Sequence, residues 1–142
     1  MRTNAQLKPV APYFIGTINE AFFEANQREV KDADFPPPFD KHLVFSATQR
    51  EVDLSYREIR IVLPKALEYK TYSLADTNFQ VHFEYIDARS ENNVVYVGIS
   101  GSITLFESSE PTSVAATFDV TVEDDNHDTK LEVDGSFDML LP

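Results

Sequence analysis

The chain has 142 residues, no cysteine and a formal net charge of −12, from 24 acidic residues against 12 lysines and arginines. This length fits one domain with its own core, and the lack of cysteine excludes disulfides, thiolate nucleophiles and cysteine-based zinc sites. The charge disfavours nucleic acid and anionic lipid surfaces, and no apolar run is long enough for membrane insertion. We expect a single domain over residues 1–142, in the cytoplasm, or secreted if a leader has been removed.

Alternation of apolar and polar residues begins after residues 1–11, which we expect to form a flexible N-terminal segment. The stretch YFIGTINEAFFEA, residues 13–25, predicts two short strands around Asn19 and Glu20. Further strands are indicated by the alternating residues Leu43, Phe45 and Ala47, and by Ile59, Ile61 and Leu63 before Pro64. The intervening DFPPPFDKH, residues 34–42, predicts a loop or an edge crossing, because proline cannot donate to a ladder.

The clearest alternation covers residues 79–85. Its apolar face carries Phe79, Val81, Phe83 and Tyr85, and its polar face carries Gln80, His82 and Glu84. A single histidine on the polar face of a strand is usually a surface residue, so His82 does not by itself indicate catalysis.

The last third of the chain allows a register to be derived. With Val122 opposite Leu131, the other inward pairs are Val120 with Val133, Phe118 with Gly135, Ala116 with Phe137, and Val114 with Met139. Every inward pair is then apolar or glycine, as one buried sheet face requires. Asn126 and His127 remain as a two-residue loop, or as part of a longer one.

The preceding hairpin is expected to turn at SSEP, residues 108–111, with Leu105 opposite Val114 and Ile103 opposite Ala116. Gly101 then faces Phe118, whose ring would cover the backbone of glycines on both neighbouring strands. Gly98 and Gly101 also predict a bend in this long strand. Altogether the pattern predicts an all-β, antiparallel β-sandwich, or flattened barrel, of about nine strands.

The order of these signals resembles a set of small uncharacterised bacterial β-sandwich domains, many of them lipoprotein-like. The matching stretches are FIGTINEAFFEA, IRIVLP, TYSL, GSITLF, ATFDVTV and VDGSFDM, which together span nearly the whole chain. The resemblance implies a fold and no catalytic residues. Lipid anchorage does not carry over, because the chain has no cysteine to take a lipid.

The segment EDDNHD, residues 123–128, raises the question of a metal. Asp124, Asn126 and Asp128 follow the D-x-N-x-D spacing that begins calcium-binding loops. The sixth position is Thr129 rather than glycine, and the twelfth is Gly135 rather than glutamate, so the match is weak. A charged hairpin tip is the favoured interpretation, because Asp and Asn side chains stabilise turns.

The outer face of the same hairpin carries the stronger functional signal. Asp119 is opposite Asp134 in the derived register, with Glu132 diagonal to both, and like charges in that position destabilise a sheet. We therefore predict a non-enzymatic binding module that engages a basic protein through Asp119, Glu132 and Asp134, or through hairpin tips. Solvent screening alone is the simpler alternative.

Two other function classes remain open. A small ligand or carbohydrate would be held on exposed aromatic side chains such as Tyr13, Tyr69 and Tyr96. An enzyme would need a carboxylate-based site, since no nucleophile elbow, phosphate-binding glycine loop or zinc motif occurs. No cofactor is expected, and the oligomeric state, monomer or dimer through exposed strand edges, is left open.

Overall fold

The computed structural model describes residues 10–33, 36–37, 41–75 and 81–142. This part of the chain forms β-strands and contains no helix long and apolar enough to cross a membrane. The strands are β1 (Tyr13–Ile18), β2 (Ala21–Glu24), β3 (Gln27–Asp32), β4 (His42–Arg50), β5 (Tyr56–Pro64), β6 (Thr71–Ser73), β7 (His82–Ala88), β8 (Val94–Glu107), β9 (Ser113–Asp124) and β10 (Lys130–Leu140).

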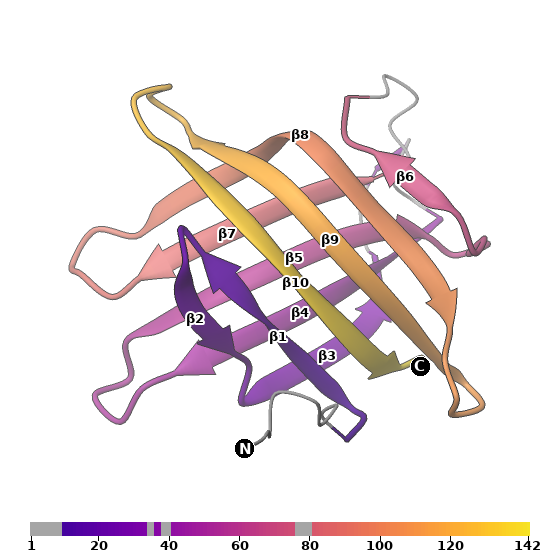
Figure 1. Cartoon of the computed structure of the whole chain (residues 1–142). Coiled ribbons are helices and arrows are strands. Elements are labelled where there is room, and N and C mark those ends of the chain that lie inside the picture. Colours follow the sequence, from indigo (N-terminus) through magenta and orange to yellow (C-terminus); the bar gives the residue numbers. More distant parts are fainter. Residues whose placement is uncertain (1–9, 34–35, 38–40, 76–80) are drawn as a thin grey trace, which may run out of the picture.

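All these strands belong to one antiparallel sheet. Their order is β2-β1-β10-β9-β8-β7-β5-β4-β3, and β6 pairs with the second half of β8. The sheet curls on itself into a half-barrel, with β1 and β10 crossing in front of β4 and β5 (Figure 1). The expectation of an antiparallel all-β fold is confirmed, but the strands form one continuous ladder rather than the two separate sheets of a sandwich.

The two edges of the sheet are consecutive in the chain. Strands β2 and β3 stand at opposite ends of the strand order, yet only Ala25 and Asn26 separate them. The Ala25 amide donates to the Phe14 carbonyl of β1, and the Asn26 amide donates to the Thr48 carbonyl of β4. The sheet is therefore closed at this end by a single kinked segment, which we call the seam.

A buried arginine crosses the seam. The guanidinium of Arg57, on β5, donates through Nη2 to the carbonyl oxygen of Phe22 at 3.0 Å and to Oε1 of Gln49 at 2.7 Å. It also lies 5.5 Å from the centre of the Phe23 ring. Only 8% of Arg57 is exposed, so these contacts replace water around a charged group and link β2, β4 and β5.

The core fills the inside of the curl and is rich in phenylalanine. The ring of Phe14 stacks on that of Phe137 with centroids 5.3 Å apart and also contacts the rings of Phe23 and Phe118. Phe45, from the opposite wall, reaches the same Phe137 ring at 5.3 Å. These contacts join β1, β10 and β9 to β4 across the interior, so one core holds the sheet curled.

The derived register of β9 and β10 is confirmed at every inward pair, from Val122 opposite Leu131 to Val114 opposite Met139. The Phe118 ring covers Gly135, where an added Cβ would lie 2.9 Å from its Cζ atom. The first hairpin is confirmed too, since β1 and β2 flank Asn19 and Glu20, which have φ of 47° and 71°.

The derived register of β8 against β9 is wrong by two residues. Leu105 is opposite Ala116, Ile103 is opposite Phe118, and Gly101 is opposite Val120 rather than Phe118. The turn is longer than four residues, because Thr112 takes a φ of 65° and β8 first pairs with β9 at Glu107 and Val114. A shift of two preserves the face of each side chain, so the inward set is unchanged.

The bend predicted near Gly98 and Gly101 is present as a β-bulge. The ladder between β8 and β9 shifts between Gly98 and Ser100, and Gly101 has a φ of 108°. In the middle of the chain, β4, β5 and β7 carry the predicted inward residues, including Phe45, Ile61 and Phe83. Residues 79–80 and most of the proline-rich stretch lie outside the described residues.

Candidate functional site

Charge is divided unequally between the two halves of the sheet. Strands β1, β8, β9 and β10 carry seven carboxylates, and their one basic side chain is Lys130. Strands β3, β4, β5 and β7 carry five carboxylates and five arginines or lysines. The outer surface of the first group, which we call the acidic face, holds five of its seven carboxylates, because Glu107 and Asp124 are opposite the inward residues Val114 and Tyr96.

Asp119 and Asp134 stand directly opposite each other on the acidic face, as the sequence predicts. Ser102 flanks Asp119 on β8, and Thr17 flanks Asp134 on β1. The Thr17 hydroxyl donates to Oδ1 of Asp134 at 2.9 Å. The Thr17 hydroxyl thus solvates Asp134 in part, but it does not cancel the charge.

Glu132 lies on the next outward row of β10. The Thr121 hydroxyl donates to its two carboxylate oxygens at 2.9 and 3.1 Å, and its amide donates to the side chain of Asn19 at 2.8 Å. Within the described part of the chain, no ion pair includes Asp119, Glu132 or Asp134. The three predicted residues therefore share one surface whose charge is uncompensated by lysine or arginine.

A shallow hollow of about 440 Å³ lies around the two aspartates. Its lining is dominated by hydroxyls and carboxylates: Ser102, Thr104, Thr117, Phe118, Asp119, Asp134, Gly135 and Ser136. Gly101 and Gly16 allow the backbone to approach closely here, because a Cβ at either position would collide with the carbonyl of Asp119 or Asp134. The hollow is suited to accept hydrogen bonds from a cationic or hydroxylated group.

The EDDNHD segment forms a closed turn. Oδ1 of Asp124 accepts from the amides of Asp128 and Thr129 at 2.9 and 3.1 Å, and His127 has a φ of 59°. The loop is thus longer than two residues. In the described ranges, no group of three potential ligands is placed to hold a metal ion. The Asp124 carboxylate caps the turn, as the favoured interpretation predicts.

A titratable pair stands beside this turn. Nδ1 of His127 lies 2.6 Å from Oε1 of Glu123, and Nζ of Lys130 lies 4.0 Å from Oε2 of the same glutamate. The hydrogen bond to Glu123 raises the pKa of His127 above its ordinary value, and the charges of Glu123, Asp124 and Asp125 act in the same direction. Protonation of the histidine would add positive charge at this end of the acidic face.

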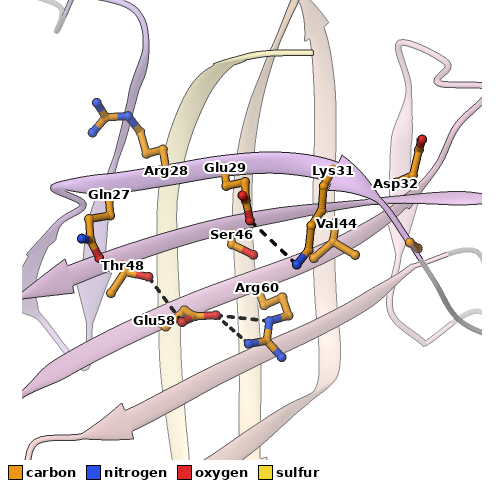
Figure 2. Close-up of a pocket in the computed structure, with 11 residues that line it drawn as sticks. Gln27, Arg28, Glu29, Lys31, Asp32, Val44, Ser46, Thr48, Glu58 and Arg60 are labelled. Carbon is orange, nitrogen blue, oxygen red and sulfur yellow. Dashed lines mark hydrogen bonds and ion pairs between the residues drawn. The ribbon is translucent and has the colours of Figure 1, made fainter. Parts of the chain in front are cut away.

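The opposite wall carries a larger hollow, of about 890 Å³, which the sequence analysis missed (Figure 2). Its charged side chains come from β3 and β5, three acidic and three basic, and form two ion pairs with one another. Arg60 contacts Glu58 at 2.8 Å, and Lys31 contacts Glu29 at 3.8 Å. Thr48 donates to Glu58 at 3.3 Å. This surface is internally neutralised, in contrast with the acidic face.

The three tyrosines considered for carbohydrate binding lie on separate elements. Tyr13 is on β1, Tyr69 is in the connection before β6, and Tyr96 is on β8. Tyr96 is half-buried and stacks on Tyr85 with ring centroids 5.6 Å apart. No ring contact joins the three within the described part of the chain.

Sequence comparison with protein-family models and with curated proteins, and structural comparison with solved structures, found no match.

Proposed function

We propose that this chain is a non-enzymatic binding module that holds a basic protein on its acidic face. The observation that carries the proposal is the cross-strand pair of Asp119 and Asp134, two like charges that no basic side chain in the described residues offsets. Apposed carboxylates cost stability in the free protein, and a bound lysine or arginine would relieve that cost. Hydroxyls around the pair would accept the remaining hydrogen bonds of such a cation.

The unequal distribution of charge supports the same function. The acidic face has five carboxylates, of which only Asp138 is buried, and one lysine, and it lies next to a neutralised opposite wall. This difference in charge favours the approach of a positively charged partner from the acidic side. Association through such a face is fast at low ionic strength and weakens steeply with salt. The partner is therefore defined by its chemistry, as a protein with a basic patch.

The experiment is affinity capture from source-cell extract, with elution by a salt gradient and identification by mass spectrometry. The double variant Asp119→Asn, Asp134→Asn removes two charges from the acidic face. Its matched control, Glu29→Gln with Asp32→Asn, removes two charges from β3. We expect a basic protein that elutes at moderate salt from the wild type and the control and is lost from the Asp119 and Asp134 variant. Equal capture by both variants would exclude the acidic face.

A further inference from the structure

The bulge in β8 turns an apolar stripe toward solvent. From residue 95 to residue 105, every odd position of this strand is apolar or glycine, which by itself predicts one buried face. The structure divides this set at the bulge. Ile103 and Leu105 are buried, whereas Val95, Val97 and Ile99 are 39%, 38% and 41% exposed. Bulges reorient side chains in this manner next to functional surfaces.

The residues that the bulge turns inward explain part of this arrangement. Tyr96 lies on the inner side, where its ring stacks on Tyr85, and Gly98 lies against Phe83 and Val120. Packing of Tyr96 therefore favours the orientation in which Tyr96 and Gly98 point inward and the stripe points outward. It leaves unexplained why three β-branched apolar residues, rather than threonines, occupy the exposed positions, since threonine suits an exposed strand equally well.

The middle of the stripe has acidic neighbours on both sides. Val97 lies between Glu84 of β7 and Glu123 of β9. Ser100, at the end of the stripe, is opposite Thr121, whose hydroxyl binds Glu132. The stripe is thus continuous with the acidic face, and at Val97 it is bordered by carboxylates, as an apolar interface centre is bordered by a polar rim. Glu84 and Glu123 also contact Arg60 and Lys130 at 3.5 and 4.0 Å, so the rim is polar rather than purely acidic.

We propose that Val95, Val97 and Ile99 form the apolar centre of the protein-binding surface, and that the partner presents apolar side chains interleaved with lysine or arginine. This inference rests on the proposed function, because it concerns the partner of the same face. A second copy of the chain would bring the same carboxylates against those of the first and would be repelled. A partner segment whose apolar side chains contact the stripe and whose lysines or arginines flank them matches both the stripe and its rim.

The test uses two synthetic peptides of equal length and charge, one alternating lysine with leucine and the other alternating lysine with threonine. Each is titrated into isotopically labelled protein, and binding is followed through the backbone amide resonances. We expect the leucine peptide to bind about tenfold more tightly, a difference of about 1.4 kcal/mol. The shifts should centre on β8 and β9.

Three variants separate the contributions. Val95→Thr with Val97→Thr should remove the preference for the leucine peptide and leave affinity for the threonine peptide unchanged. If that double variant does not fold, Val97→Thr alone should reduce the preference. Val52→Thr, which alters an exposed valine in the connection between β4 and β5, is the control and should change neither affinity. Asp119→Asn with Asp134→Asn should weaken both peptides.

The outcomes distinguish the two proposals. Equal binding of both peptides by the wild type, with loss in the Asp119 and Asp134 variant, would overturn the apolar centre and support the acidic face. A preference for the leucine peptide that Val97→Thr leaves undiminished, or shifts confined to other strands, would also overturn it. Failure of both peptides to bind at low salt would count against the proposed function itself.

Discussion

The Nη2 atom of Arg57 donates a 3.0 Å hydrogen bond to the carbonyl oxygen of Phe22, a residue 35 positions earlier in the chain. Phe22 belongs to β2 at one edge of the sheet, and Arg57 belongs to β5 near the other edge. This bond fastens the curl where the ladder itself does not continue. It makes a charged residue part of the seam.

Replacing this arginine should destabilise the fold. Arg57→Ala leaves the Phe22 carbonyl and the Gln49 side chain without their donor and removes the cation from the Phe23 ring. We expect the free energy of unfolding to fall by about 3 kcal/mol, measured by urea denaturation. The free energy of unfolding of Arg57→Lys should lie between those of the wild type and Arg57→Ala, because one ammonium cannot reproduce the planar donor geometry of the guanidinium.

The control is Arg89→Ala, which removes an exposed arginine that pairs with Asp87 at 2.8 Å. An exposed pair is worth roughly 1 kcal/mol or less, so the effect should be much smaller. Equal effects of the two substitutions would show that Arg57 does not fasten the seam.

Removal of one apposed charge on the acidic face should stabilise the protein. Asp119→Asn relieves the repulsion with Asp134 and leaves the bond from Thr17 to Asp134 in place. We expect a gain of about 0.5 kcal/mol in the free energy of unfolding at low salt. The gain should shrink as salt is added, because screening already weakens the repulsion. A salt-independent gain would point to a different cause.

The glycine beneath the Phe118 ring should not tolerate a side chain. In Gly135→Ala, the new methyl group would lie 2.9 Å from Cζ of Phe118 and against the backbone of Ile15 and Gly16. Overpacking of this kind costs about 1–3 kcal/mol, which thermal or urea unfolding would detect. Gly98→Ala should cost less, because its nearest neighbours are side-chain atoms of Phe83, Leu74 and Val120 at 3.0–3.3 Å. The reverse order would contradict the close approach of β1 and β10.

The pair of His127 and Glu123 should make stability depend on pH. The folded protein raises the pKa of His127 above the ordinary 6.5, so the protonated form is favoured in the folded state. The resulting stabilisation is complete below pH 6.5, the unfolded value, and is lost as pH rises through the raised folded value. Glu123→Gln should lower the pKa of His127, followed by its imidazole resonances. An unchanged pKa would contradict the role of Glu123.

Ionisation of Tyr85 should make the stability of the fold depend on pH in the alkaline range. Burial, followed by the charge of Asp87, raises the pKa of its hydroxyl from 10.0 to about 12. The unfolded chain therefore releases this proton first, and stability should fall between pH 10 and about 12 by up to about 3 kcal/mol. Tyr85→Phe should abolish that part of the alkaline dependence. Tyrosinate absorbance at high pH would check the assignment, and early ionisation of all tyrosines in the wild type would contradict it.

Strand register was predicted best from the sequence where neighbouring strands are consecutive in the chain and one face of the sheet is plainly buried. The β9–β10 register follows from alternation alone, because a single slip would place Val120 and Val122 in solvent. The opposition of Asp119 and Asp134 follows from that register. The unequal charge distribution did not follow, because it depends on strand order across the whole sheet.

Two features could not be read from alternation. The outward turn of Val97 results from a bulge, which reverses a pattern that otherwise predicts burial. The burial of Arg57 results from the contact between sheet edges, a tertiary relation that an arginine between Tyr56 and Glu58 does not signal. Both lie where curvature or closure decides the environment of a side chain.

The pairing of β1 with β10 has a consequence for synthesis on the ribosome. From β7 to β10 each strand pairs with the next as it emerges. Strand β1 must wait for β10, because residues 13–18 pair with residues 133–138. Until β10 emerges, β1 has β2 as its ladder partner, and Phe14 lacks the Phe137 ring on which it stacks. A nascent chain therefore carries an unfinished core until β10 has been made, which makes chaperone binding to β1 and β2 an expected stage of its folding.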